Sequence, residues 1–277
     1  MVGVMPLDGV RVIDLTWYTA GPFCTRVLAD YGADVIKVEP PRGDPARGLP
    51  PFMDDEPGLE RSGLFMFLNT NKRSVVLDLK TDAGRQQLRA LVRTADILVQ
   101  SFSPGTMDAL GLGYESLRAL NSRLVVTSLS NFGQTGPYRD LQGLDLTLFA
   151  MGGPMIAGGE AEHEPLKNAG RATTYHAGYV AALATMVSLR GAELRGEGEH
   201  VDVSIFETAA HSIDLRLSRL LAFQYTGSSS GRPALASAVG SGVFPCADGF
   251  FMLTAGAQRL DDLIRMIGHE ELLTQPE

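Results

Sequence analysis

The sequence predicts an α/β protein with a Rossmann-like, doubly wound parallel sheet, and three observations carry this prediction. Short β-branched runs alternate with helical patterns as far as about residue 130. The first two runs, residues 10–15 and 34–38, are apolar almost throughout, as strands buried on both faces are. The helical segment between them begins at Gly21 and ends at Tyr31, which makes a βαβ unit. We therefore expect a parallel sheet flanked by helices.

The remaining elements follow from the same patterns. A stretch rich in Pro, Gly and charge, residues 41–64, is too long for a simple connection and is expected to cover something. Further strands are expected at residues 74–79, 97–99, 124–127, 201–204 and 250–253. Helices are expected at residues 82–94, 144–150, 173–190 and 206–225, with another from about residue 258.

The chain is long enough for one large or two modest domains, because it has 277 residues. We expect a large domain over residues 1–225, followed by a hinge and the beginning of a small domain over residues 226–277. The run Gly227–Gly231 matches the serine-hydrolase pattern G-x-S-x-G, but it follows a helix and reads as a linker. Only some fifty residues follow it, so the small domain is expected to be incomplete.

Composition excludes several classes of function. With 24 Lys and Arg against 32 Asp and Glu, the net charge is −8, so no basic field is available for nucleic acid. Cys24 and Cys246 are too few for a disulfide framework. The N-terminus lacks the pattern of a signal peptide, and residues 171–190 fit a buried helix better than a membrane span. We therefore expect a cytoplasmic protein without a membrane partner.

Two segments predict an anion site. The run Asn69–Arg73 places two adjacent cations, framed by Asn, at the mouth of an expected strand, which suits a phosphate. A solvated loop would explain the same residues equally well. The residues Thr19–Pro22 follow the first strand, and their backbone N–H groups could meet a ligand at the start of a helix. No metal is expected, because no pair of the five His residues has a metal-ligand spacing.

Several blocks in fixed order, spread over nearly the whole chain, make the sequence resemble the family III CoA-transferases. This family includes formyl-CoA transferase, carnitine CoA-transferase and α-methylacyl-CoA racemase. The longest blocks are PLDGVRVIDL at residues 6–15, LADYGADVIKVEPP at 28–41 and FGQTGPY at 132–138. Shorter blocks lie at residues 20–22, 71–74, 104–105, 111–114, 196–198, 201–204 and 246–249.

The resemblance implies a Rossmann-like large domain that binds coenzyme A, a smaller second domain and an interlocked dimer. Family members are longer than this chain, and their C-terminal part returns to the large domain. Acyl-CoA and a carboxylic acid are the implied substrates, and Lys72 and Arg73 are the implied partners of the CoA phosphates. Carried over by position, the CoA contacts are Tyr18, Thr19, Ala20, Pro40, Thr70, Asn71, Lys72, Arg73, Ser101, Phe102, Ser103, Ser130, Asn131 and Phe132.

The resemblance also implies a covalent mechanism. In the family an Asp carboxylate attacks the donor thioester, forms a mixed anhydride and then becomes an aspartyl-CoA thioester that exchanges with the acceptor acid. This Asp stands four residues before a Gly at the start of a helix. Counting back from Gly178 places the position at Thr174, whose hydroxyl cannot form the anhydride. Many relatives also carry Arg where this chain has Ser103.

Three functions remain open. The first is an active CoA-transferase with a substitute acid, for which Glu160, Glu162 and Glu164 are the nearest candidates. The second is a catalytically silent subunit that binds CoA, or completes a dimer, beside an active paralogue bearing the Asp. The expected assembly is a homodimer or a heterodimer with such a paralogous subunit. The third is an acyl-CoA racemase, which is disfavoured because Leu144 stands where that branch has its proton-transferring His.

Overall fold

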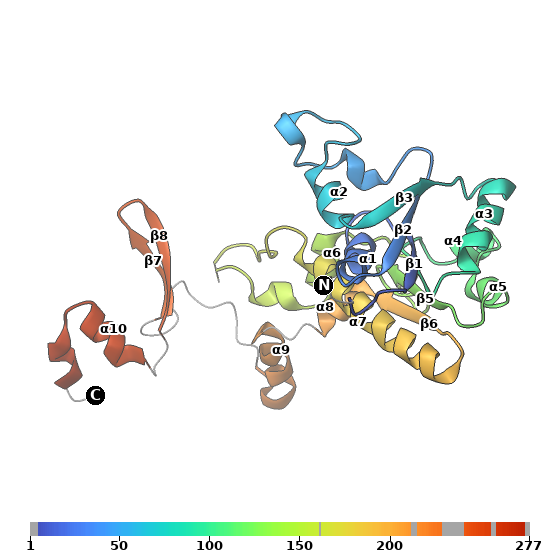
Figure 1. The fold of residues 1–277 in the computed structure, drawn as a ribbon. Helices are drawn as coiled ribbons and strands as arrows, with labels where there is room; N and C mark the ends of the chain where they lie inside the picture. Colours follow the sequence, from blue (N-terminus) through green and yellow to red (C-terminus); the bar gives the residue numbers. More distant parts are fainter. Residues whose placement is uncertain (1–4, 161, 212–214, 229–240, 256–258, 275–277) are drawn as a thin grey trace. The chain divides into compact units, whose positions relative to one another are not determined.

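A computed structural model describes residues 5–160, 162–211, 215–228, 241–255 and 259–274 (Figure 1). The chain divides into two compact units, one made of residues 1–153 and 168–212, the other of residues 154–167 and 213–277. The expected domain boundary at residues 225–226 falls inside the second unit, and the division into domains stays a prediction.

The first unit is built on a six-stranded parallel sheet of strand order β3-β2-β1-β4-β5-β6. The order reverses between β1 and β4, as it does in doubly wound folds, so the predicted fold class is confirmed. In folds of this class ligands bind at the carboxyl ends of the strands where the order reverses, so the loops after β1 and β4 are where we look for a site. The strands are β1 (Arg11–Leu15), β2 (Asp34–Glu39), β3 (Lys72–Val76), β4 (Ile97–Gln100), β5 (Val125–Ser130) and β6 (His200–Ser204).

Helices cover both faces of this sheet (Figure 1). One face packs against α1 (Ala20–Asp30) and α7 (Ala172–Arg195), and the other against α3 (Asp82–Val92), α4 (Thr106–Ala109) and α5 (Tyr114–Arg118). Helix α7 approaches α1 closely, because a Cβ added at Gly178 would lie 2.6 Å from the carbonyl oxygen of Ala20. The unit also contains α2 (Gly63–Leu68), α6 (Asp145–Met151), α8 (Ile205–Ala210) and the 3-10 turns η1 (Pro45–Gly48) and η2 (Met53–Asp55).

The second unit contains a two-stranded antiparallel hairpin and short helices. The hairpin pairs β7 with β8, in a register that places Phe244 opposite Phe251. The elements of this unit are η3 (Pro154–Ala157), α9 (Leu215–Thr226), β7 (Ser241–Cys246), β8 (Gly249–Thr254), α10 (Leu260–Met266) and η5 (Glu270–Thr274).

The structure corrects two expectations about elements and adds one strand. The strand expected at residues 74–79 is β3, which runs from Lys72 to Val76, because its pairing with β2 begins at Lys72 opposite Val35 and ends at Val76 opposite Glu39. The helix expected over residues 206–225 is two helices, since α8 ends at Ala210, and residues 212–214 lie outside the described part. Strand β7 was not expected at all. Of the expected hinge at 227–231, residues 229–231 lie outside the described part.

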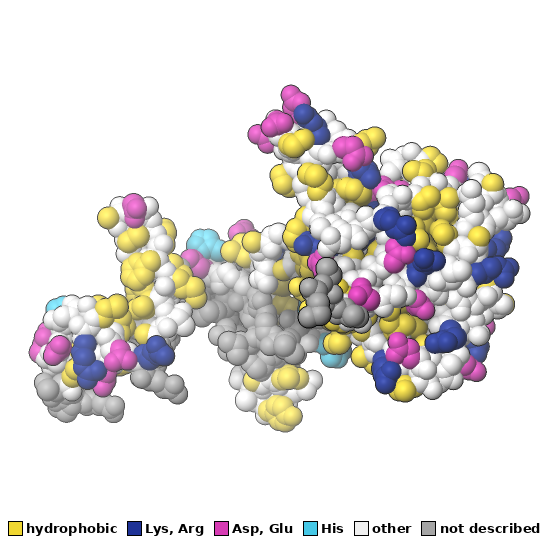
Figure 2. Space-filling model, in the orientation of Figure 1, with side chains coloured by type: hydrophobic (Ala, Val, Ile, Leu, Met, Phe, Trp, Pro, Cys, Tyr) yellow, Lys and Arg dark blue, Asp and Glu magenta, His cyan; other side chains and the backbone are white. Residues whose placement is uncertain are grey.

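The distribution of charge over the surface and the hydropathy of the helices can be described directly. On the face drawn in Figure 2, basic and acidic side chains alternate over the first unit, and no extended basic field forms. Among the described residues, no helix has the length and apolar character that crossing a membrane requires.

Candidate functional site

The loop after β1 is fixed by side chains from two other loops of the first unit. The backbone N–H of Trp17 donates to Oγ of Ser101, after β4, at 2.9 Å. The N–H of Tyr18 donates to Oδ1 of Asp44, after β2, at 3.3 Å. Tyr18 has a φ of 64°, a left-handed conformation that a non-glycine residue adopts at a cost. The loop is therefore held in one strained shape, a common property of binding sites.

The start of α7 joins this loop. Nη1 of Arg171, the residue just before α7, donates to Oγ1 of Thr19 at 3.0 Å. The hydroxyl of Thr174 donates to the carbonyl oxygen of Arg171 at 2.9 Å. The backbone N–H of Thr174 donates to Oδ1 of Asp145, the first residue of α6, at 3.3 Å. The structure thus gathers the predicted nucleophile position, a predicted CoA contact, a cation and a carboxylate that sequence reasoning missed.

Buried ion pairs stabilise the loop after β1 from the interior of the unit. Nζ of Lys37 lies 2.8 Å from Oδ2 of Asp44 and donates to the carbonyl oxygen of Thr16 at 2.9 Å. Glu39, at the end of β2, accepts two hydrogen bonds from the Arg47 guanidinium, each at 2.8 Å. Burial alone would raise the pKa of Glu39, but these bonds and others outweigh it and lower the pKa to about 2. The turn after β2 is therefore tied to the sheet by charges.

Lys72 belongs to the same interior network. Its Nζ donates to Oδ2 of Asp14 at 3.0 Å, to the carbonyl oxygen of Pro22 at 2.8 Å and to Oδ1 of Asn69 at 2.9 Å. An ammonium group has three N–H donors, so none remains for a phosphate. Burial lowers the pKa of Lys72 to about 8. Burial would raise the pKa of Asp14, but the charges of Lys72 and Lys37 lower it to about 2. In this geometry Lys72 has a role inside the fold.

The other residues of the Asn-Lys-Arg segment lie at the opposite edge of the sheet. Arg73 is 68% exposed and pairs with Asp34, at the beginning of β2. Nδ2 of Asn71 donates to Oδ1 of Asp30, at the end of α1, at 2.7 Å. Thr70 is exposed beside them. These three side chains are therefore not brought together with the loops after β1, β4 and β5, and their contacts with CoA stay a prediction.

The remaining predicted contacts lie where strands of the sheet end. Phe102 meets the ring of Trp17 edge-on, with centroids 5.2 Å apart. Nδ2 of Asn131 donates to the carbonyl oxygen of Gly143 at 3.0 Å, which ties the end of β5 to the segment before α6. Because the carboxyl ends of parallel strands share one edge, these residues lie at the same edge of the sheet as the loop after β1. This group comprises Ala20, Pro40, Ser101, Phe102, Ser103, Ser130, Asn131 and Phe132.

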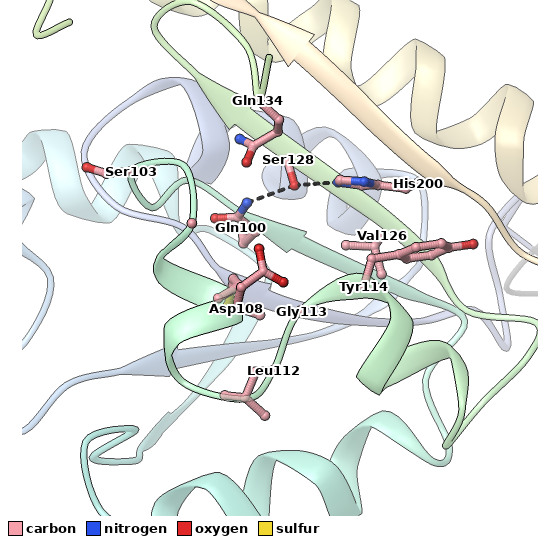
Figure 3. Close-up of a pocket in the computed structure, with 12 residues that line it drawn as sticks. Gln100, Ser103, Asp108, Leu112, Gly113, Tyr114, Val126, Ser128, Gln134 and His200 are labelled. Carbon is pink, nitrogen blue, oxygen red and sulfur yellow. Dashed lines mark hydrogen bonds between the residues drawn. The ribbon is translucent and has the colours of Figure 1, made fainter. Parts of the chain in front are cut away.

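A small polar cavity of about 40 Å³ lies beside Ser103, on the sheet face covered by α4 and α5. Nε2 of Gln100 donates to Oγ of Ser128 at 2.7 Å, and Oγ lies 2.8 Å from Nε2 of His200. Figure 3 shows these three side chains in a row, with the Asp108 carboxylate pointing toward them. Burial lowers the pKa of His200 and so favours its neutral form. The cavity has room for a few waters and is far too small for CoA.

The other sequence candidates belong to the second unit or lack the chemistry. Glu160, Glu162 and Glu164 belong to the second unit, where the carboxylate of Glu160 pairs with His163 at 3.0 Å. Leu144 is 73% exposed and has no proton to transfer. Within the described residues, no group of three or more His, Cys, Asp or Glu side chains could hold a metal ion.

Comparisons with known proteins agree with these features. A family model described as CoA-transferase family III matches residues 7–277. The succinyl-CoA–D-citramalate CoA-transferase of Chloroflexus aurantiacus is 38% identical over 98% of this chain and 67% of its own length. A subunit of the succinyl-CoA:(R)-benzylsuccinate CoA-transferase of Thauera aromatica is 36% identical over 91% of this chain and 60% of its own length. The chain thus spans about two thirds of the length of these relatives.

Solved structures show the same fold. A CAIB/BAIF family protein from Brucella suis superposes with a TM-score of 0.88 at 33% identity, over 99% of this chain and 72% of its own. A protein from Mycobacterium tuberculosis, solved as a variant in which an Asp is replaced by Ala, gives a TM-score of 0.78 at 31% identity, over 98% of this chain and 70% of its own.

Proposed function

The chain belongs to CoA-transferase family III, and we propose that it takes part in moving CoA between an acyl-CoA thioester and a free carboxylic acid. The observation that carries this proposal is the meeting of the loop after β1 with the start of α7, through Arg171 and Thr19. This contact sets the predicted nucleophile position, Thr174, beside the loop that is expected to hold CoA.

CoA is a substrate in this reaction, and the loops at the carboxyl edge of the sheet are the part of the fold that we propose holds it. The backbone N–H groups at the start of α1 can meet a phosphate, since the first turn of a helix leaves N–H groups without partners. The Lys37–Asp44 pair and Ser101 keep this loop in shape. Lys72 bonds to Asp14 of β1 and to Pro22 of α1, on either side of this loop. We propose that it stabilises the loop in this way and makes no phosphate contact.

The chemical step needs a carboxylate. It attacks the thioester carbon, so that a mixed anhydride forms and CoA leaves as a thiolate; the thiolate then attacks the enzyme's carbonyl carbon and releases the donor acid. The acceptor carboxylate reverses both steps and leaves with CoA. Thr174 cannot carry an acyl group in this way. In the described part of the first unit, Asp145 is the carboxylate that hydrogen-bonds to Thr174, so it is our first candidate for a substitute.

A second candidate function is a CoA-binding subunit without turnover of its own. Thr174 supports it, because the family resemblance predicts a carboxylate at this position and the chain carries a hydroxyl. One relative, from Thauera aromatica, is itself named as a subunit. In this case a paralogous chain would bring the Asp, and this chain would complete the assembly.

An apolar stripe on α7 supports an assembly of two chains. Four side chains at or near helical spacing are exposed there: Tyr179 58%, Leu183 60%, Val187 65% and Leu194 70%. Monomeric proteins rarely leave such a stripe in water. We propose that a second copy or a paralogue covers it. Light scattering at micromolar concentration should show at least a dimer, and Leu183→Glu should weaken it; a monodisperse monomer would contradict the assembly.

Mass spectrometry after incubation with an acyl-CoA separates the two functions. An acyl or CoA adduct on the unaltered chain, lost in Asp145→Asn and kept in Thr174→Ala, supports transfer through Asp145. No adduct on the unaltered chain, but an adduct in Thr174→Asp, supports the silent subunit. Calorimetry provides the control, because a folded chain that binds no CoA would overturn both functions.

A further inference from the structure

We propose that Gln100 and Ser128 are positioning residues, which hold the loop after β4 in the shape that binds CoA, and that His200 makes this shape dependent on pH. The loop consists of residues 101–103, three of the predicted CoA contacts. This inference rests on the proposed function, because it assigns a regulation to the same site.

Gln100, the last residue of β4, connects the loop to the interior of the sheet. Its Oε1 accepts from the backbone N–H of Phe102 at 2.7 Å, and its Nε2 donates to Oγ of Ser128 at 2.7 Å. Gln100 is 4% exposed and Ser128 is 2% exposed, so these bonds are shielded from water. The parallel register places Gln100 opposite Ser128 of β5. The backbone of the loop is therefore fixed to a neighbouring strand through one side chain.

The loop after β4 in turn holds the loop after β1. Oγ of Ser101 accepts from the backbone N–H of Trp17, and the ring of Phe102 meets the ring of Trp17 edge-on. A shift of the loop after β4 therefore moves both contacts of Trp17. It also disturbs Tyr18 and Thr19, the predicted CoA contacts that follow Trp17 in the sequence.

The Ser128 hydroxyl determines which form of His200 fits. Its oxygen accepts from Gln100 and lies 2.8 Å from Nε2 of His200 (Figure 3). A serine hydroxyl has one proton, and within the described residues Nε2 is the acceptor it contacts, so a neutral His200 accepts that proton. A protonated ring donates from Nε2 instead, which leaves the buried O–H of Ser128 without an acceptor. Neutral His200 therefore completes a relay of hydrogen bonds to Phe102, and protonated His200 interrupts it.

His200 can exchange its proton with water, because it is exposed at the start of β6 although its ring lines the cavity. Burial of part of the ring lowers the pKa of His200, whereas the charges of Asp202, on the same strand, and Asp108, on α4, raise it. Tyr114 of α5 stacks on the ring, with centroids 5.2 Å apart. The relay is therefore complete at neutral pH and is interrupted in acid. The charged groups around Tyr114 are Glu115 and Arg118 of α5 and Glu197 and Glu199 before β6.

The fluorescence of Trp17, the only tryptophan in the sequence, follows the loops without any ligand. We expect the emission of the full chain to show one transition between about pH 7.5 and about pH 5. His200→Gln should abolish the transition, because its side-chain oxygen accepts the Ser128 proton and is not protonated in this range. Gln100→Leu, which removes both bonds, should change the emission at every pH. His211→Gln, at an exposed histidine that ends α8, is the matched control and should keep the transition.

Calorimetric titration with CoA measures the effect on binding. Over the same pH range, the affinity of the unaltered chain should fall about threefold to tenfold more than that of His200→Gln, as expected for the loss of one buried hydrogen bond. The comparison cancels the titration of CoA itself, which both chains share. Gln100→Leu should weaken CoA binding at both ends of the range. Gln87→Leu, at an exposed position of α3, is its control and should leave binding unchanged.

Other outcomes would overturn the proposal. A fluorescence transition that remains in His200→Gln would belong to another group, and no transition in the unaltered chain would mean that His200 does not act on the loops. If Gln100→Leu fails to fold, the comparison with His200→Gln still decides. An unaltered chain that shows the transition but binds no CoA would refute the proposed function and leave the relay intact. Equal pH dependence of CoA binding in the unaltered chain and His200→Gln would refute the regulation and leave the proposed function standing.

Discussion

The interior beneath the loop after β1 and the start of α7 are both charged, but their charges are bonded in opposite ways. In the interior, Lys72 and Lys37 have acidic partners in the protein and are shielded from water. At the start of α7, the guanidinium of Arg171 makes a single hydrogen bond within the described residues. The difference separates charges that maintain the architecture from a charge that is available to a ligand, although both types of residue look alike in the sequence.

The same contrast appears within one dipeptide. Lys72 and Arg73 are neighbours on β3, yet successive side chains of a strand point to opposite faces. Lys72 therefore enters the layer between the sheet and α1, and Arg73 stays in water. A pair of adjacent cations in a sequence thus does not by itself define a phosphate site.

The largest expected effect is the loss of Lys72. Lys72→Met leaves Asp14 buried without its cation, which should lower the free energy of unfolding by about 3–5 kcal/mol. Denaturant unfolding measures this loss. Lys80→Met, which removes an exposed cation just beyond β3, is the control and should stay within about 0.5 kcal/mol. If Lys72→Met changed the free energy of unfolding as little as Lys80→Met, the interior ion pairs would not be what stabilises this region.

The second largest effect is expected from acid, which should lower the free energy of unfolding. The pKa values of Asp14 and Glu39 are lowered to about 2 in the fold, so the stability that they contribute is complete above about pH 4.5 and is lost as the pH falls toward 2. Each should contribute about 2–3 kcal/mol over that range. Unfolding measured from pH 5 to pH 2 should show a slope that Glu39→Gln reduces. The exposed Asp82→Asn should leave the slope unchanged, and a flat profile in the unaltered chain would count against both assignments.

A smaller effect is expected at the start of α7. Asp145→Ala removes the acceptor of the Thr174 N–H, which is equivalent to losing a helix cap, and should cost about 1 kcal/mol. Asp145→Asn keeps an acceptor oxygen and should recover part of the stability. Thermal unfolding of the two variants measures this, and an identical loss in both would show that the charge matters more than the hydrogen bond.

The smallest effect is expected for Arg73. Its pair with Asp34 is largely in water, and such pairs contribute little, so Arg73→Gln should change the free energy of unfolding by less than about 0.5 kcal/mol. Measured in the same experiment, Lys72→Met and Arg73→Gln compare how much a cation on each face of β3 contributes to the free energy of unfolding. If Arg73→Gln lowered the free energy of unfolding by more than about 2 kcal/mol, Arg73 would also stabilise the fold, and the proposed difference between it and Lys72 would be wrong.

Much of the fold could be predicted from the sequence because hydrophobic periodicity is local information. The βαβ unit around Gly21 needed only about thirty residues of pattern, and the parallel sheet followed from it. The beginning of β3 was missed because Lys72 and Arg73 look like loop residues, and only pairing with β2 shows that they are strand residues. Strand β7 was missed because its pattern includes Gly and Pro, which usually argue against a strand.

For the candidate site, local signals and the family pattern pointed only to Thr174 and to the loop after β1, and their roles stay predictions. The hydrogen bond between Arg171 and Thr19 joins residues 152 positions apart, and that between Thr174 and Asp145 joins residues 29 apart. The relay from Gln100 to His200 likewise spans two strands. Nothing in the local sequence of any of these residues indicates its partner, so three-dimensional contact was needed to find them.

The division of the chain sets an order in which the units can form during synthesis. Residues 154–167 leave the ribosome before α7 and β6, but they belong to the second unit, and the rest of that unit begins only at residue 213. Meanwhile β6 pairs with β5, and α7 packs against α1, which completes the parallel sheet and its core. A nascent chain therefore finishes the first unit while the early part of the second still waits for its partner segment.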